Sequence, residues 1–131
     1  MAMSGAQEPT GPLDVALQHA ARLLPTRPDL AAEQALEILK AAPGHPLATL
    51  MLAAAHRAQG DAASALELLE PLARAHPAWV APHYESGLAL ARLGQLDESV
   101  AAFRRATQLK PGMSDAWRAL GDALTAIGDT D

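Results

Sequence analysis

Apolar positions along the chain recur in helix-length segments that are separated by Gly and Pro. One such segment lies between Pro43 and Gly60, and the next lies between Gly60 and Pro77. Gly is favoured just beyond a helix C-terminus, where φ turns positive, and Pro cannot continue a helix. Each pair of segments therefore predicts a helix, a tight turn and an antiparallel helix. The whole pattern predicts helices at residues 12–24, 28–41, 46–59, 62–75, 80–93, 96–109 and 114–127.

The Gly and Pro residues that separate the helix-length segments recur at a constant interval. Two series have a spacing of 34 residues: Pro43, Pro77 and Pro111, and Gly60, Gly94 and Gly128. Two independent series with the same period are hard to obtain by chance, and a period of this size is typical of stacked helix–turn–helix units. We therefore predict a flexible tail at residues 1–11 and one domain at residues 12–131. Its units are predicted at 12–45, 46–79 and 80–113, with a partial unit at 114–131.

The first unit departs from the pattern. Thr26 stands at the position of the turn Gly, between Pro25 and Pro28. We predict that Thr26 caps the following helix together with Asp29, as a variant of the capping box with Asp in place of Glu. Atypical end units are expected in a stack, because a terminal unit has solvent where its neighbour would lie.

Composition agrees with a globular, all-helical chain. Half of the residues are apolar and 19% are charged. Ala is common, whereas Phe and Tyr occur once each, and this balance favours helices over strands. The chain has no Cys, no apolar run as long as a membrane helix and no secretion signal at its start. We therefore expect a soluble, cytoplasmic protein.

Charge and motif content argue against several classes of function. The formal net charge is −5, and Arg104–Arg105 is the one adjacent basic pair, so binding to nucleic acid is not expected. The sequence shows no paired catalytic carboxylates, no phosphate-binding loop and no nucleophile elbow. No two of its five His have the i, i+4 spacing of a helical metal site: His19, His45, His56, His76 and His83. We expect no enzyme activity, no metal and no cofactor.

The segment GLALARLGQLDESVAAFRRATQLKP, residues 87–111, resembles a tetratricopeptide repeat, and DAWRALGDALTAIGD, residues 115–129, resembles the first half of another. The family places a large residue, Leu-Gly and a second large residue on the first helix of each repeat. Its second helix carries a small residue, an aromatic residue and an Ala before the closing Pro. In the last unit the matching positions are Trp117, Leu120, Gly121 and Leu124.

The match is uneven along the chain. The third unit has Gly87, Leu90, Ser99, Phe103, Ala106 and Pro111 in place, but it carries His83 and Ser86 instead of the usual Trp and Leu. The matching residues of the second unit are Leu52, Ala53, Gly60, Ala65, Leu69, Leu72 and Pro77. Those of the first unit are Ala31, Ala35, Ile38 and Pro43.

The resemblance implies an all-α fold, a right-handed superhelical α-solenoid of about three and a half 34-residue repeats. It implies that the two helices of a unit approach most closely at Ala53, Gly87 and Gly121. The larger side chains that fill the space between units are then Leu69, Leu90, Phe103 and Leu124. A bulky residue at a close approach would overpack the core.

The resemblance also implies a binding surface, the concave groove lined by the first helix of each unit. Carrying the family's groove positions over gives Ala16, Ala20, Leu47, Leu50, Ala54, Arg57, Tyr84, Leu88, Arg92, Arg118 and Asp122. Relatives that grip the C-terminal carboxylate of a chaperone use Lys and Asn in this groove, where this chain has Ala, Leu and Tyr. We therefore predict a scaffold or adaptor that binds an apolar or amphipathic polypeptide segment with some acidic character, without a carboxylate clamp. The alternative is that these residues pack against the chain's own tail or a neighbouring domain.

The last predicted helix is more apolar than a solvent-facing end helix normally is. It carries Trp117, Leu120, Leu124 and Ile127, and no second helix follows it. Two hypotheses follow: self-association through this helix, or a longer protein of which this chain is a fragment. The early segments LQHAARLL and LAAEQALEILKAAPGHPLA resemble the repeat region of bacterial proteins that continue into a sulfotransferase domain. In that case the chain is an accessory domain of a larger bacterial enzyme.

Overall fold

The structure is a computed structural model that describes the backbone of residues 11–130 and the side chains of residues 11–128. Residues 1–10, most of the predicted tail, lie outside the described part. The described residues form helices and no strand, with α2 at Pro12–Leu23, α3 at Pro28–Ala41, α4 at Pro46–Ala58, α5 at Ala62–Ala75, α6 at Val80–Arg92, α7 at Leu96–Leu109 and α8 at Ser114–Thr130. The seven predicted helices are confirmed, and the first six begin and end within one residue of the predicted bounds.

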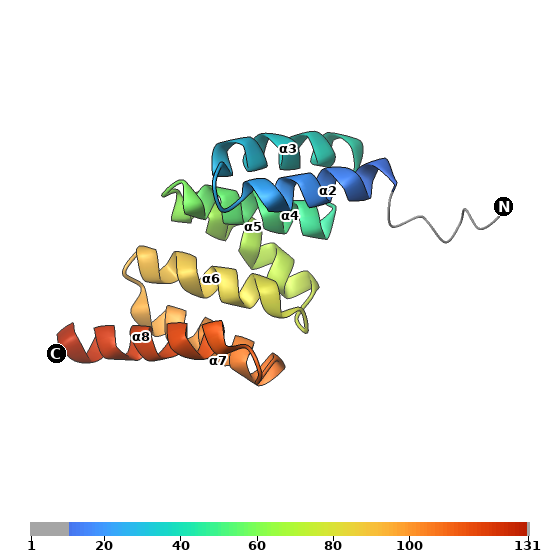
Figure 1. The fold of residues 1–131 in the computed structure, drawn as a ribbon. Helices are drawn as coiled ribbons and strands as arrows, with labels where there is room; N and C mark the ends of the chain where they lie inside the picture. The colour runs from blue at the N-terminus through green and yellow to red at the C-terminus, as the bar shows by residue number, and fades with distance from the viewer. Residues whose placement is uncertain (1–10, 131) are drawn as a thin grey trace.

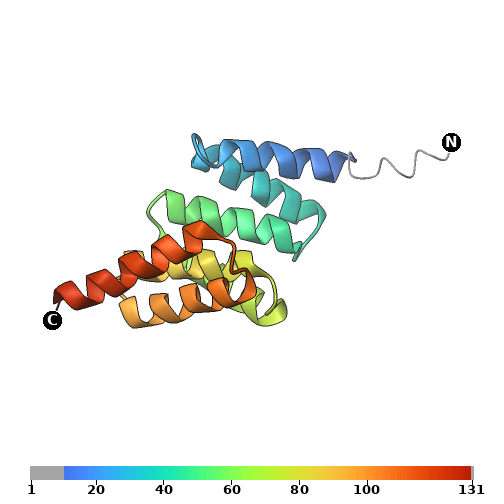
Figure 2. The same cartoon turned by 60° about the horizontal axis from the view of Figure 1, so that its bottom comes forward.

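The helices form antiparallel pairs that stack along one direction, from α2 and α3 at one end to α7 and α8 at the other (Figure 1). Each helix contacts the next one along the chain. The first helices of successive units, α2, α4, α6 and α8, also contact one another in turn, whereas among the described residues α3, α5 and α7 do not. The second view shows the same succession with α8 in front (Figure 2). This arrangement is the predicted α-solenoid, with the first helices lining one side.

The turns within the middle units depend on Gly60 and Gly94, which have φ of 90° and 79°. In each turn the amide after the Gly bonds back to a carbonyl of the last helical turn, from Asp61 to His56 and from Gln95 to Leu90. This is the Schellman arrangement, and it requires the left-handed backbone that Gly adopts at little cost. The prediction that Gly128 ends the last helix is wrong. Helix α8 passes through Gly128 to Thr130, and no third turn of this kind occurs among the described residues.

The N-terminal cap predicted for α3 is absent, and α5 has a cap that was not predicted. The proposed capping by Thr26 is wrong, because the residue before α3 is Arg27 and no side chain caps this helix. Asp29 instead pairs with Arg27, with Oδ2 2.9 Å from the guanidinium Nη2. Helix α5 is capped by Asp61, whose Oδ1 accepts a hydrogen bond of 3.1 Å from the amide of Ser64. This cap satisfies an amide that has no partner within the helix.

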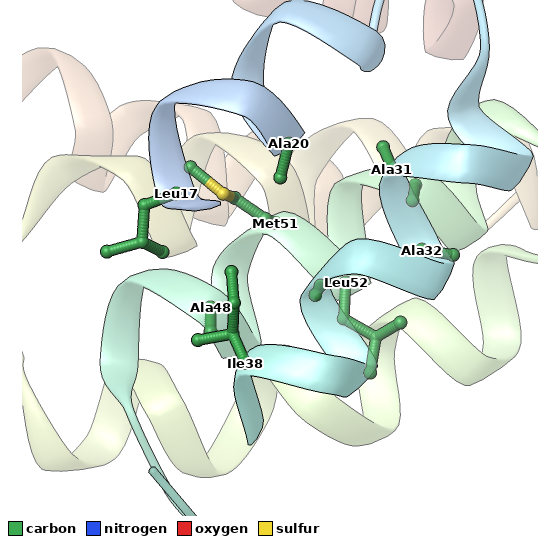
Figure 3. Packing of buried hydrophobic residues seen from close by; sticks show 10 residues of the cluster. Leu17, Ala20, Ala31, Ala32, Ile38, Ala48, Met51 and Leu52 are labelled. Carbon is green, nitrogen blue, oxygen red and sulfur yellow. The ribbon is translucent and has the colours of Figure 1, made fainter. Parts of the chain in front are cut away.

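The core of the first half is built largely from Ala. One buried cluster joins α2, α3 and α4 and includes Leu17, Ile38, Met51 and Leu52 among several Ala (Figure 3). Ala20 and Ala31 have no exposed surface at all. Small side chains let the helices approach closely, and no unit can bury its apolar face without its neighbours. Stacking therefore closes the core.

A second close contact joins α6 and α7 at Gly87. A Cβ atom added to Gly87 would lie no more than 2.8 Å from three carbons of the Phe103 ring. The hydroxyl of Ser99 donates a 2.8 Å hydrogen bond to the carbonyl of Gly87 at the same place. In the preceding unit the equivalent pair is Ala53 with Leu69, both fully buried in one cluster. The predicted close approach at Gly87 is thus confirmed, and in the second unit a smaller Leu accompanies the slightly larger Ala. The predictions for the last unit are wrong, because a Cβ at Gly121 would meet nothing within 4 Å and Leu124 is 42% exposed.

Candidate functional site

A cavity of about 430 Å³ opens between the first helices of the third and fourth units, α6 and α8. Its walls are mostly apolar, and three charged side chains, from α4, α6 and α8, complete the lining. The apolar lining residues are Leu88, Ala91, Leu96, Phe103, Ala119, Ala123 and Ala126, and the charged ones are Arg57, Arg92 and Asp122. A concave site with apolar walls and a few polar groups is the usual form of a binding pocket.

The charged side chains around this cavity differ in how far they are already paired. Arg57 of α4 donates from Nε to Glu85 Oε1 of α6 at 2.7 Å, with 27% and 16% of the two side chains exposed. This pair joins the second unit to the third. Arg92 and Asp122 are exposed, and neither forms an ion pair within residues 11–128. The surroundings of the cavity therefore offer guanidinium donors from α4 and α6 and a carboxylate acceptor from α8.

Tyr84 lies beside the cavity on α6. Its ring packs against the ring of Phe103, with centroids 5.9 Å apart and planes tilted by 52°. Burial raises the pKa of Tyr84 above its ordinary value of 10.0, and the carboxylates of Asp115 and Glu85 act in the same direction. The phenol therefore stays protonated at neutral pH and can both donate and accept a hydrogen bond.

The structure brings together part of the groove predicted from the sequence. Arg57, Leu88, Arg92 and Asp122 line the one cavity. Beside them Tyr84 is half-buried, while Arg118 is exposed and lies 3.4 Å from Asp115. The six predicted residues in this group come from α4, α6 and α8 and form a continuous part of the predicted surface.

The other predicted residues lie elsewhere. Leu47 lines a separate cavity of about 380 Å³ between α2 and α4, and Leu50 packs against the buried cluster around Leu69. Ala20 has no exposed surface and Ala54 has 7%, so both lie in the core in this conformation. Ala16 lines hollows next to α3, at the end of the stack.

The sequence reasoning missed the small residues that make the cavity. Ala119, Ala123 and Ala126 of α8 and Ala91 of α6 line it because their side chains leave space between the two helices. The available signal was the three- and four-residue spacing of the Ala residues along α8, which places them on one helix face. Phe103 was predicted as core, and it is buried at the wall of the cavity, with 1% of its surface exposed.

A larger hollow of about 650 Å³ lies on the first unit between α2 and α3. Charged side chains from α3 line it, among them Glu33, Glu37 and Lys40. Lys40 and Glu37 already pair with each other at 2.9 Å. This hollow also has apolar lining residues, Leu23, Leu30, Leu36 and Leu39, but none of the predicted groove residues lines it. The cavity between α6 and α8, which four of them line, is therefore the better candidate.

Several His have structural partners. His45 precedes α4, and its Nδ1 accepts a 3.3 Å hydrogen bond from the amide of Ala48. His83 Nε2 donates to the carbonyl of Pro77 at 3.0 Å, and the His76 ring meets the Trp79 ring edge-on at 5.9 Å. Within the described ranges, no group of three or more His, Asp or Glu is placed to hold a metal ion. No helix in that part of the chain is long and apolar enough to cross a membrane.

Solved structures with the same fold include helical repeat domains from different organisms. The chain is similar to the TPR domain of Sgt2 from Aspergillus fumigatus, with 19% identity, a TM-score of 0.83, and 93% of this chain and 83% of that chain covered. It is similar to the first TPR of Spaghetti (RPAP3) bound to the HSP90 peptide SRMEEVD, with 18% identity, a TM-score of 0.79, and 88% and 93% covered. It is also similar to part of a Thermobaculum terrenum O-GlcNAc transferase mutant, with 24% identity, a TM-score of 0.81, and 86% of this chain but 22% of that chain covered.

Sequence comparison leads to one family. No curated protein sequence matches the chain significantly. The comparisons give no support to the resemblance to sulfotransferase-linked proteins, since what they find in the chain is the repeat alone. The model of the tetratricopeptide repeat matches residues 26–79 and 84–131, most of the chain. With its helical pairs, its 34-residue period and this match, the chain belongs to the tetratricopeptide repeat family.

Proposed function

We propose that this chain is a non-catalytic scaffold that binds a polypeptide segment along the surface of α4, α6 and α8. The observation that carries the proposal is the cavity between α6 and α8, with apolar walls and, in its lining, an Arg92 that has no ion-pair partner among the described residues. The fold supports it, because tetratricopeptide domains are generally protein-interaction modules. The neighbour bound to the HSP90 peptide is an example of such a domain holding a peptide.

The cavity sets the chemistry of the bound segment. Its volume of about 430 Å³ admits at least one large apolar side chain, and burying a Leu, Met or Phe side chain contributes about 1.5–3 kcal/mol. An acidic residue next to that anchor would accept charge-assisted hydrogen bonds from Arg92 and from the free nitrogens of Arg57. Asp122, on the other helix, would accept from an amide or hydroxyl of the segment. The bound segment is therefore amphipathic, with its acidic residue toward α6.

The same surface argues for a ligand other than a chaperone C-terminus. Family members that grip such a carboxylate use Lys and Asn in the groove, where this chain has Ala, Leu and Tyr, among them Ala16, Leu50 and Tyr84. Ala16 and Leu50 offer no side-chain donor, and the Tyr84 phenol is neutral. We propose that binding comes from an internal apolar anchor and an adjacent acidic side chain.

The proposal is tested with peptides selected from a random display library on the whole chain. Ala91→Leu takes up part of the cavity, and Arg92→Glu reverses the charge in its lining. We expect each variant to weaken the selected peptides at least about tenfold, which corresponds to about 1.4 kcal/mol. The matched controls are Ala101→Leu and Arg105→Glu, which change the same residue types at exposed positions of α7 outside the cavity.

Three outcomes of that screen count against the proposal. Selected peptides without an apolar residue next to an acidic one would contradict the chemistry assigned to the cavity. Equal affinity for the wild type and for Ala91→Leu would place the binding surface elsewhere. A loss of binding that is equally large in the two α7 controls would show a general effect of the substitutions, not one confined to the cavity.

A second candidate function is the non-catalytic arm of a larger enzyme. It is favoured by the fold match to O-GlcNAc transferase, in which the matched part makes up 22% of that chain. In that role the same surface would hold a protein substrate or partner for a catalytic domain in cis. Sequencing the reading frame on both sides of this segment tests the candidate directly, because a neighbouring catalytic domain is required by it.

A further inference from the structure

One face of α8 is apolar, exposed and covered by no other helix of the described chain. Trp117 and Leu124 on this face are 51% and 42% exposed. Gly121 and Gly128 lie on the same face, because residues four and seven apart along a helix are neighbours. A Cβ added at either Gly would meet nothing within 4 Å. The open face of α8, defined by these four residues, therefore alternates large side chains with two flat positions.

This face continues an interface that is already formed one unit earlier. In that unit Gly87, 34 residues before Gly121, is covered by Phe103 of α7. The two first helices are also anchored alike, since His83 Nε2 donates to the carbonyl of Pro77 and Trp117 Nε1 donates to that of Pro111, at 3.0 and 2.7 Å. The surface of α8 around Gly121 thus resembles the surface of α6 around Gly87, which α7 covers. It leaves space for a large side chain above Gly121.

We propose that the open face of α8 binds the same face of a second copy of the chain, with the two helices antiparallel. The spacing of large and small residues along this face makes it complementary to itself. When two copies of α8 are placed antiparallel so that Leu124 of each lies over Gly121 of the other, Trp117 of each lies over Gly128 of the other. A single two-fold arrangement therefore sets every large residue of the face against a Gly of the partner, as Phe103 is set against Gly87 within one chain.

The charged residues near the face are compatible with this antiparallel pair. Asp122 lines the cavity on the other side of α8, so it points away from the open face. Arg118 lies at the margin of the face and is exposed. In the antiparallel arrangement the two copies of Arg118 are offset by about nine residues along the helix axis, which is about 14 Å. That separation exceeds the screening length of about 10 Å at moderate salt, so their repulsion is small.

A parallel pair in register fits this face less well. It would set Trp117 against Trp117 and Leu124 against Leu124, and it would leave the two Gly positions facing each other across empty space. The partial charges at the helix ends also favour the antiparallel pair, because each N-terminus then lies nearest the C-terminus of the partner. The fit of side chains and the helix dipoles therefore both favour the antiparallel orientation.

The contact is a weak one by its size. A single pair of helices of this length buries less surface than the roughly 1,200 Å² of a stable standard interface. We therefore expect reversible association with a dissociation constant on the order of 10 µM, so that dilution separates the copies. Sedimentation equilibrium of the whole chain should show a mass that rises with concentration from 13.6 kDa toward twice that value.

Substitutions at the Gly positions test the arrangement without damaging the monomer. Gly121→Leu meets open space within the chain and replaces a poor helix former, so the melting temperature should not fall. It should weaken dimerisation at least about tenfold, because Leu124 of the partner loses its place. The double variant Gly121→Leu with Leu124→Gly restores a large residue opposite each Gly and should recover most of the dimer. Ala101→Leu on the exposed face of α7 is the matched control and should dimerise as the wild type does.

The results that would overturn the proposal are equally specific. A wild-type chain that stays at 13.6 kDa at high concentration would exclude self-association through any face. A Gly121→Leu variant that dimerises as tightly as the wild type would place the contact away from α8. A double variant that stays monomeric while it melts as the wild type does would contradict the antiparallel pairing of Leu124 with Gly121. Each of these results is independent of peptide binding, since none of the four residues of the face lines the cavity.

Discussion

The contact between Gly87 and Phe103 allows a sharp test of how the units are packed. Gly87→Ala places a Cβ no more than 2.8 Å from three carbons of the Phe103 ring, so the ring or the backbone has to move. Overpacking of this kind costs about 1–3 kcal/mol, and the gain in helix propensity returns up to about 1 kcal/mol. The net expected loss in the free energy of unfolding is about 1–2 kcal/mol.

The neighbouring unit supplies the compensating change. Because Ala53 packs with Leu69 at the equivalent positions, Phe103→Leu should make room for the Cβ introduced by Gly87→Ala and reproduce a pair that already occurs in the molecule. Alone, Phe103→Leu leaves part of the space empty and should cost about 1–2 kcal/mol. In the double variant the two losses should not add, and the coupling energy should be about 1–2 kcal/mol in favour of the pair.

The coupling energy is measured with a double-mutant cycle. The wild type, both single variants and the double variant are unfolded in urea, and unfolding is followed by far-ultraviolet circular dichroism. All four curves are fitted with the same model, since the units of a repeat array need not unfold together. Additive losses would refute the reasoning, because they would show that the two positions do not share one space. A Gly87→Ala chain as stable as the wild type would show that the ring adapts at no cost.

Three further results are expected. Ser99→Ala removes the 2.8 Å hydrogen bond to the Gly87 carbonyl inside the core and should lower the unfolding free energy by about 1–3 kcal/mol, measured by the same urea titration. Hydrogen bonds from Ser64 lower the pKa of Asp61, so the charged cap stabilises the fold above the unfolded-state pKa and loses this effect as the pH falls through the lower folded-state value. The melting temperature of Asp61→Asn should therefore lie below that of the wild type at neutral pH and converge with it as the pH falls below about 4. In fluorescence polarisation the peptide SRMEEVD should bind the chain at least about tenfold more weakly than a peptide selected on it, because the groove lacks Lys and Asn; equal binding would contradict the absence of a clamp.

The fold could be predicted from the sequence to within a residue at most helix ends, because Gly and Pro act locally. Gly60 and Gly94 have the positive φ that their position after a helix requires. Gly128 misled the prediction because α8 continues through it to Thr130. A Gly lowers helix propensity by only about 1 kcal/mol, so it does not end a helix by itself. Thr26 misled it because a competing ion pair between Arg27 and Asp29 engages the carboxylate that the predicted cap needed.

The candidate site could be predicted only in part, because a groove position depends on how neighbouring helices tilt. Of the groove residues taken from the family register, Arg57, Leu88, Arg92 and Asp122 line one cavity, and their role in binding stays a prediction. It assigned Ala20 and Ala54 to the surface, but Ala side chains allow the helices to close over them, and both are buried. The cavity itself arises from side chains that are short, so its volume follows from packing in three dimensions and not from the residue at any single position.

The central claim is that a polypeptide segment binds over the cavity between α6 and α8. Two-dimensional amide NMR spectra of the isotope-labelled chain, recorded as a display-selected peptide is titrated in, test it most directly. We expect the largest chemical-shift changes at residues that line the cavity, among them Leu88, Ala91, Arg92 and Ala123, and little change at the amides of Ala101 and Arg105. Shifts concentrated on α2 and α3, or on the outer face of α7, would contradict it.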